Sequence, residues 1–381
     1  MLITHGEESK LTSWYFEIDR GLLGCILILI VIGLMAIVSV GSAQAAYMGY
    51  PWFYFLKKAL LPYTIGFVAL FGFSMLNKKQ VIKISIIGLL IGIVALICTF
   101  VNKHPMNGSL RWLFIREGIS FMPSDLIKPF FIVLTAWFLS KMHNVYGSDI
   151  FLNKKAWKLS KISWWPYLLL FAVCILLIFL HPDVGTAVLY VGVLSIMLFV
   201  AGFPYKLLPA IFGVFIAMAI AALTFMPHIK NRAMHIFDIA RDSQAWYSIN
   251  SIRHGGLFGS GEESYVKDVL PESTNDFVYS AIAEDWGAIG ACLLVVLLFI
   301  ILSKLIKHAS MAKDDFVVYA VSGTAALFGG QICFNLMTAL HLFIDKGMTL
   351  PFVSYGGVSF VVFCILFGMT LALIREDTWN K

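Results

Sequence analysis

Long apolar runs separated by short polar segments dominate the chain. Ten runs are each about 20 residues long, the length that an α-helix needs to cross a hydrocarbon core of about 30 Å. The pattern therefore predicts an all-α polytopic membrane protein with about ten transmembrane helices, forming a single membrane domain over residues 1–381. The predicted helices are 21–40, 59–76, 82–101, 125–141, 164–180, 184–202, 206–226, 277–303, 316–342 and 353–374.

Composition agrees with this pattern. Of the 381 residues, 60% are hydrophobic and 13% are charged, whereas a soluble domain carries about 25% charged residues. The net charge of +6 comes from basic residues in short loops between apolar runs, where they set the orientation in the membrane. The chain has no stripe of basic residues that would indicate a nucleic-acid partner. The six cysteines all lie in apolar runs without metal-ligand spacing, which is typical of small buried side chains.

The distribution of Lys and Arg predicts the orientation. With both termini in the cytoplasm, sixteen Lys and Arg fall in inner segments and six in the short outer loops, as the positive-inside rule requires. The first helix resembles a signal peptide because Ala43-Gln44-Ala45 follows it, but its length and acidic leader favour a retained helix. The orientation places a large extracytoplasmic loop, residues 227–276, between helices 7 and 8. A loop of this length is more often functional than idle.

Polar residues surround the start of the helix at 125–141. Ser124 is a suitable N-cap, since its hydroxyl can accept from unpaired amides of the first turn. Asp125 and Lys128 are three residues apart and can form an ion pair, which we interpret as structural support. Arg111 precedes this helix in the outer loop 102–124, where it is available to an anion.

Asp183 follows His181-Pro182 at another outer helix junction. Two interpretations stay open: an N-capping aspartate in a solvated turn, or a residue that binds an ion or substrate. The small residues of Leu350 to Ser359 also allow two interpretations, close helix packing or a substrate contact.

Asp276 is the strongest candidate for chemistry. It ends the loop 227–276 and directly precedes the apolar run that starts at Phe277. A carboxylate at the edge of a membrane helix is energetically unfavourable and is usually kept for function. The same loop contains a glycine-dense turn, Gly255 to Gly261, which would let backbone approach a ligand.

Positive charge is also expected at this outer face. The helices that start near Ser124, Phe277 and Val353 would all direct their N-terminal dipole ends outward. Together with Arg111, Arg232 and Lys267, these ends would form a basic cradle for an anionic, phosphate-bearing lipid headgroup. We therefore predict a substrate that reaches the site from the membrane.

Several motifs resemble the SEDS family of polytopic membrane glycosyltransferases over nearly the whole chain. They are Arg111-Trp112, Pro123-Ser124-Asp125 with Lys128, Pro182-Asp183-Val184-Gly185-Thr186, Leu270-Pro271-Glu272 with Asp276-Phe277 and Glu284, and Leu350-Pro351-Phe352-Val353-Ser354-Tyr355-Gly356-Gly357. The resemblance departs at Asp125, where the family usually has Glu, and at His181, where it usually has Gln.

The resemblance implies a peptidoglycan glycosyltransferase of the bacterial cytoplasmic (inner) membrane that polymerises lipid II into glycan strands. It also implies a class B penicillin-binding protein as transpeptidase partner, together with other division proteins. Val266-Lys267 before Leu270-Pro271-Glu272 favours the division-type members, which act at the septum, over the elongation type. A lipid II flippase and a non-enzymatic division scaffold are the rival hypotheses.

The implied reaction assigns roles to these residues. Inversion at an anomeric carbon with a pyrophosphate leaving group needs one base and nearby positive charge. We therefore predict Asp276 as general base and Asp183, Asp125 and Lys128 as structural support. The predicted substrate-binding residues are Arg111, Arg232, Lys267, Glu272, Ser354, Gly356 and Gly357. A divalent cation, Mg²⁺ or Mn²⁺, held by Asp276 or Glu272 with the phosphates is an open alternative, and no ligand spacing in the chain establishes it.

Overall fold

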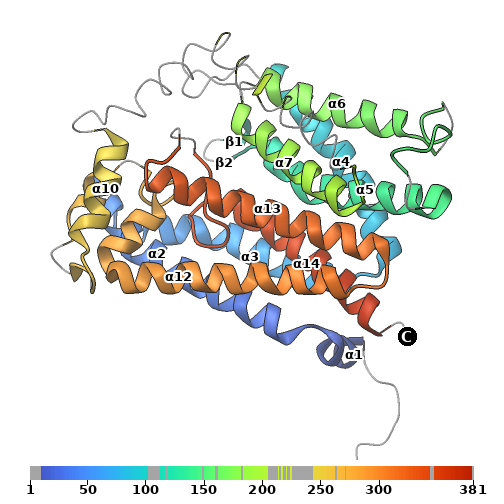
Figure 1. Ribbon diagram of the computed structural model, residues 1–381. Helices are drawn as coiled ribbons and strands as arrows, with labels where there is room; N and C mark the ends of the chain where they lie inside the picture. Colours follow the sequence, from blue (N-terminus) through green and yellow to red (C-terminus); the bar gives the residue numbers. More distant parts are fainter. Residues whose placement is uncertain are drawn as a thin grey trace, which may run out of the picture.

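The computed structural model describes most of the chain and shows a bundle of long helices (Figure 1). The described residues are 10–101, 112–116, 119–147, 150–158, 162–181, 183–204, 213, 216–217, 220, 224, 243–261, 264–270, 272–343 and 347–379.

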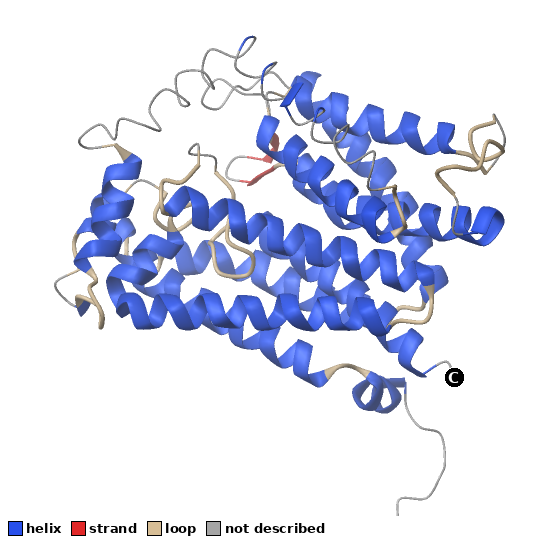
Figure 2. Cartoon of the chain, viewed as in Figure 1, coloured by secondary structure: helices blue, strands red, loops and turns tan. Residues whose placement is uncertain are grey.

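Helices account for nearly all of the regular structure in these residues (Figure 2). The bundle consists of α2 (Arg20–Tyr47), α3 (Tyr54–Ser74), α4 (Lys78–Val101), α5 (Pro123–Tyr146), α6 (Trp164–Leu180), α7 (Val184–Val200), α12 (Val278–Met311), α13 (Asp315–Ala339) and α14 (Gly357–Trp379). Shorter elements flank the bundle: α1 (Lys10–Glu17), α10 (Gln244–His254), α11 (Val266–Val269), β1 (Leu113–Arg116) and β2 (Ile119–Phe121).

The prediction of an all-helical, multi-span membrane protein is confirmed. Within the described residues, seven helices are long and apolar enough to cross a membrane, and α6 and α7 are shorter apolar helices of 17 residues. These nine match nine of the ten predicted spans. The predicted span 206–226 lies almost entirely outside the described residues.

Three helices form the protein interior. In α14, α13 and α5, 83%, 78% and 72% of the most apolar window is buried, against 22–39% in α2, α3, α4 and α12. The interior helices therefore pack against other helices on most sides, whereas the other four leave apolar sides exposed, as lipid-facing helices do. Figure 1 shows α13 and α14 in the middle of the bundle, with α12 and α2 along one side.

A two-stranded hairpin interrupts the outer loop 102–124, where the sequence predicted no regular structure. Strands β1 and β2 pair antiparallel, with Leu113 opposite Phe121 and an irregularity between Phe114 and Arg116. The hairpin leads directly into α5 and thereby fixes the entry of the chain into the interior of the bundle (Figure 1).

Ion pairs close the opposite end of the bundle. Arg375 Nε lies 3.7 Å from Glu17 Oε2, which ties α14 to α1. His308 Nε2 lies 2.6 Å from Asp19 Oδ2, which ties α12 to the start of α2. Helix α1 and the last turn of α14 thus lie at the same end (Figure 1), which agrees with two termini on one side; the cytoplasmic assignment of that side stays a prediction.

Helix α12 is kinked at Gly287. The backbone there has φ 68° and ψ −176°, a combination that is essentially accessible only to glycine. The turn after α10 packs into the kink: Ala288 N donates to Gly256 O at 2.9 Å, and Ser260 N donates to Glu284 O at 2.9 Å. A β-carbon on Gly259 would overlap the carbonyl of Asp285. Gly255 and Gly259 therefore admit the α12 backbone, whereas Gly256 and Gly261 have open space beside them. The approach of this turn to a ligand stays a prediction.

Candidate functional site

Asp276 lies in a tight turn immediately before α12. The turn begins at Glu272, whose φ is 57° and whose carbonyl accepts hydrogen bonds from the amides of Asn275 at 3.0 Å, Asp276 at 3.1 Å and Phe277 at 3.3 Å. The Glu272 side chain is exposed and accepts from Asn275 Nδ2 at 2.6 Å. Three amides on one carbonyl define the course of the backbone at Asp276, so the turn presents this residue at the entrance of the helix.

Contacts from α13 and from the segment after it hold Asp276. Asn335 Nδ2 donates to Asp276 O at 2.8 Å and to Met348 O at 2.7 Å. The Asp276 carboxylate lies directly against Gly347, where a β-carbon would overlap it. Asp276 is nevertheless half-buried rather than enclosed, so part of the residue stays exposed while its backbone is fixed.

The segment before α14 also supports this turn. Ser354, which is 2% exposed, donates from Oγ to Asn275 O at 2.5 Å and accepts from Leu350 N at 2.8 Å. Tyr355 N donates to Thr274 O at 2.9 Å. The predicted residue Ser354 thus lies against the turn that carries Asp276, in a structural contact; its contact with substrate stays a prediction.

Gly356 and Gly357 are placed where a larger residue would not fit. A β-carbon on Gly356 would overlap the methyl group of Thr349, and one on Gly357 would press on the ring of Pro62 in α3. This geometry supports the close-packing interpretation of these glycines. Their predicted role in binding substrate is untested.

Asp125 and Lys128 form the ion pair that their spacing predicts. Lys128 Nζ lies 2.6 Å from Asp125 Oδ1 and donates to Gln331 Oε1 of α13 at 3.1 Å. Gln331 Nε2 in turn donates to the carbonyl of Thr349 at 3.0 Å. Because Gln331 and Asn335 are four residues apart on one face of α13, this helix connects the buried ion pair of α5 to the turn of Asp276.

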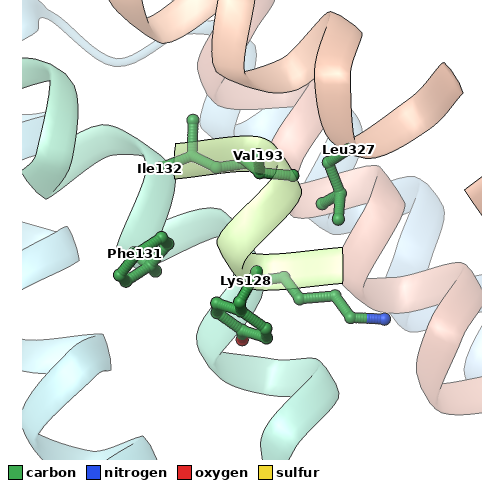
Figure 3. Close-up of a pocket in the computed structure, with 6 residues that line it drawn as sticks. Lys128, Phe131, Ile132, Val193 and Leu327 are labelled. Carbon is green, nitrogen blue, oxygen red and sulfur yellow. The ribbon is translucent and has the colours of Figure 1, made fainter. Parts of the chain in front are cut away.

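A small cavity of about 10 Å³ lies beside this lysine, close to the space that one water molecule occupies. Its lining residues are Lys128, Phe131, Ile132, Tyr190, Val193 and Leu327. Figure 3 shows the Lys128 ammonium directed away from Phe131 and Ile132, so the cavity meets the apolar stem of the lysine. The cavity is too small and too apolar for a sugar or a phosphate.

The expected N-cap at Ser124 is wrong. Helix α5 begins at Pro123, with Met122 in the cap position and no side-chain cap bond. Proline suits the first helical position because it has no amide hydrogen to satisfy there. Ser124 therefore lies inside the first turn, where its carbonyl accepts from Tyr190 Oη at 2.8 Å.

Asp183 is the N-cap of α7. Its Oδ1 accepts from Thr186 N at 3.3 Å, as one of the two sequence interpretations expected. The residue is 1% exposed, however, so the junction is buried and not a solvated turn. His181 beside it bonds to Thr99 of α4, which joins three helices at this junction.

Lys267 is buried in an ion pair. It is 6% exposed, and its ammonium contacts Asp285 of α12 and lies 3.5 Å from Ser39 Oγ of α2. Asp285 Oδ2 also accepts from Ser39 Oγ at 2.5 Å. A lysine neutralised in this way is poorly placed to bind an incoming pyrophosphate, so the predicted anion-binding role of Lys267 is not favoured by its geometry.

Glu284 is the main anchor of the segment that runs from α10 through α11 to the turn before α12 (described residues 243–261, 264–270 and 272–277). We call it the outer segment after the side of the membrane that the sequence predicts for it. It is fully buried and accepts from the amides of Tyr265 at 3.0 Å, Val266 at 2.9 Å and Lys267 at 2.7 Å. Ser251 Oγ at 2.6 Å and His254 Nδ1 at 3.0 Å complete its contacts from α10. One carboxylate thus binds α10 and α11 to α12. Sequence reasoning placed Glu284 in a motif but missed this role.

The same outer segment contains a carboxyl with a perturbed pKa. Burial raises the pKa of Asp268 above its usual value of 3.8, the Lys267 ammonium opposes this effect, and the charges of Glu284 and Asp285 reinforce it. Negative charge therefore accumulates around Lys267, which further reduces the attraction of this region for an anion.

The remaining predicted cations, Arg111 and Arg232, lie outside the described residues. Among the described residues, no group of three or more His, Cys, Asp or Glu side chains is close enough to hold a metal ion. Asp276 and Glu272 thus have no third acidic, histidine or cysteine ligand beside them in this part of the chain, and a divalent cation there would depend on oxygens of the substrate.

The fold and this geometry define a class: an all-helical, multi-span membrane protein with a half-buried aspartate held in a turn at one helix entrance. The chain belongs to the cell cycle protein family of FtsW, RodA and SpoVE, the SEDS family, whose profile matches residues 20–378.

Relatives and solved structures agree with this membership. The chain is 29% identical to a probable peptidoglycan glycosyltransferase FtsW of Caulobacter vibrioides, covering 97% of this chain and 92% of the relative. It is also 29% identical to one of Coxiella burnetii, covering 97% and 99%. A chain in the structure of a peptidoglycan synthase complex superposes with a TM-score of 0.74 at 22% identity, covering 95% and 99%. The rod shape determining protein RodA of Thermus thermophilus gives 0.67 at 21%, covering 94% and 97%.

Proposed function

We propose that this chain is a peptidoglycan glycosyltransferase that polymerises lipid II, with Asp276 as the general base. Family membership over residues 20–378 and the names of the relatives, which are probable peptidoglycan glycosyltransferases, support the reaction class. The single observation that supports the base is the placement of Asp276, whose backbone is fixed by Asn335 while the residue stays half-buried at the entrance of α12.

The proposed step is a single displacement with inversion. The Asp276 carboxylate takes the proton of the 4-hydroxyl of the acceptor sugar, whose oxygen bonds to the anomeric carbon of the donor. The bond from that carbon to the pyrophosphate oxygen breaks, and the undecaprenyl pyrophosphate leaves with the electron pair. A positioned base contributes about 10²–10⁴-fold in rate, and pyrophosphate leaves without the protonated second carboxyl that most glycosidases need.

The leaving group requires positive charge as its own charge develops. We assign this role to Arg111 and Arg232, and we do not assign it to Lys267, because the Lys267 ammonium is paired with Asp285. Glu272 lies at the exposed edge of the turn, where it can contact the acceptor sugar. No step in this scheme depends on a metal ion.

A role in septal wall synthesis is the finer part of the proposal. The relatives named FtsW support the division-type function, and likeness to a chain of a peptidoglycan synthase complex supports a class B penicillin-binding protein as partner, within a larger set of division proteins. Fluorescence imaging of the tagged chain tests this assignment. A band at midcell in the inner membrane is expected, whereas signal confined to the side wall would indicate an elongation function.

The catalytic assignment is tested with purified protein and lipid II. Asp276→Asn removes the base while preserving the shape of the side chain, and we expect glycan polymer to fall by about 10²-fold or more. Asp268→Asn, in the same outer segment, is the matched control and should retain most activity. Full polymer formation by the Asp276 variant, with the Asp268 variant equally active, would disprove the role of Asp276.

A further inference from the structure

Two large apolar side chains protrude from the turn between α10 and α11. Leu257 is 65% exposed and Phe258 is 82% exposed. We call this pair the apolar wedge. In a soluble protein one exposed residue of this kind would need no explanation, but here two adjacent ones stand at the boundary of a membrane bundle.

The wedge is held rigidly against α12. Leu257 O accepts from Ile289 N at 3.3 Å, and the neighbouring Gly256 O accepts from Ala288 N at 2.9 Å. Gly259, at φ 92°, crosses the α12 backbone at Gly287. These contacts fix the height of the wedge along α12, so its exposure does not result from a loosely attached loop.

That height coincides with the start of the lipid-facing side of α12. Ile289, Leu293, Val296 and Ile300 are 49%, 64%, 53% and 41% exposed, and their spacing of four, three and four places them on one helix face. Because the backbone of Leu257 is bonded to that of Ile289, the wedge extends this apolar face.

The polar side of the boundary is equally well defined. Asp285, one turn before Ile289, is in the ion pair with Lys267, and Glu284 binds the amides of α11. The transition from ionised to lipid-facing residues thus occurs within about one helical turn. The wedge lies on the apolar side of this transition.

We propose that Leu257 and Phe258 insert into the lipid leaflet at the boundary between headgroups and acyl chains, and so anchor the outer segment that holds Asp276 to the membrane surface. The occupant of the surface around the wedge is phospholipid. The apolar wedge is continuous with the lipid-facing side of α12, and neither of its two side chains is charged. Both features favour contact with lipid acyl chains.

Photocrosslinking of the full-length protein in vesicles of phosphatidylethanolamine and phosphatidylglycerol tests the proposal. Phe258 is replaced by p-benzoylphenylalanine, and Tyr265 is replaced likewise as the matched control. Tyr265 is an aromatic residue of similar exposure, 61%, but its amide is bonded to Glu284 on the polar side. We expect several-fold more covalent lipid adduct at position 258 than at position 265, measured by mass spectrometry.

Equal lipid adducts at both positions would overturn the proposal. The proposal would also be overturned if, in native membranes, the Phe258 variant crosslinked to a protein and not to lipid, because a partner helix would then cover the wedge. If the crosslinker prevents folding, Phe258→Trp serves in vesicles with bromine on the upper acyl chain. Quenching of the added fluorescence supports insertion, and fluorescence unchanged by bromine overturns it.

Discussion

Asn335 of α13 donates a hydrogen bond to the backbone carbonyl of Asp276 at 2.8 Å and a second one to Met348 O at 2.7 Å. One buried amide therefore joins the turn before α12 to the segment that leads into α14. Neither the turn nor the segment has regular structure of its own at this point. The position of the proposed base consequently depends on a side chain that does not belong to the outer loop.

Asn335→Leu should reduce both stability and activity. The substitution keeps the volume of the side chain but leaves two carbonyls without their donor, at a cost of about 1–3 kcal/mol for each buried group. A shift of the base by about 1 Å can reduce the rate about 10²-fold. Polymer assays and thermal unfolding in detergent measure the two effects. Cys333→Ser, at an exposed position of the same helix, is the control, and an Asn335→Leu protein as active as this control would contradict the positioning role.

Gly347→Ala tests the carboxylate itself. The added methyl group would overlap the Asp276 carboxylate, so the carboxylate must move while the bonds to its backbone remain. We expect a fall in polymerisation of about 10-fold or more with little change in melting temperature. Gly72→Ala is the comparison, because a β-carbon there meets no other atom within 4 Å. Equal activities of the two variants would show that the carboxylate position is not critical.

The apolar runs were sufficient to predict the nine apolar helices of the described residues, because bilayer thickness imposes a length that is visible in the sequence. The start of α5 was predicted at residue 125, after Ser124 as a capping residue, but the helix begins at Pro123. Proline fits the first helical position, and Ser124 therefore lies inside the helix. The hairpin β1–β2 was missed because its strands, Leu113–Arg116 and Ile119–Phe121, are too short for an alternating pattern.

Ion pairs between residues of different elements could not be predicted from the sequence. The pair Asp125–Lys128 is local and was expected from spacing, whereas Lys267 pairs with Asp285 across two elements, and nothing in the chain order indicates that contact. Gln331 and Asn335 did carry a signal, since they are polar, four residues apart and inside an apolar run. Such a pair on one helix face indicates buried hydrogen bonds in a membrane protein.

Glu284→Gln should loosen the outer segment. The buried carboxylate accepts from three backbone amides and two side chains, and a carboxamide would direct its own N–H groups at some of these donors. We expect a loss of stability of about 1–3 kcal/mol or more and faster proteolysis between α10 and α11. Glu272→Gln, with an exposed side chain, should change stability by no more than about 0.5 kcal/mol. Equal protease resistance of the two variants would refute the anchoring role.

The stabilising effect of the contacts between α12 and the start of α2 should depend on pH, because these contacts include the Asp19 carboxylate. The hydrogen bond from His308 lowers the pKa of Asp19 from 3.8 to about 2, and the Leu22 amide and Lys304 act in the same direction against the effect of burial. A depressed carboxyl pKa stabilises the fold fully above about pH 4, and this contribution is lost as the pH falls toward 2.

Asp19→Asn isolates that charge, because asparagine still caps α2. The difference in melting temperature between wild type and this variant should shrink as the pH is lowered from about 5 to about 3. Asp19→Ala, which also removes the cap to Leu22 N, should retain a further deficit of about 1 kcal/mol at every pH. A wild-type advantage over Asp19→Asn that is constant with pH would contradict the assigned pKa.

Gly287→Ala, at the kink of α12, should be strongly destabilising. The residue combines φ 68° with backbone contacts to Leu257 and Gly259, so alanine adds steric overlap to conformational strain of about 1–3 kcal/mol. Gly261→Ala separates the two effects, since Gly261 also has a positive φ, 54°, but open space around its α-carbon. Thermal unfolding should therefore show a clearly larger loss for Gly287→Ala than for Gly261→Ala. Similar losses would mean that the backbone crossing at the kink contributes little, and that φ alone requires glycine at both positions.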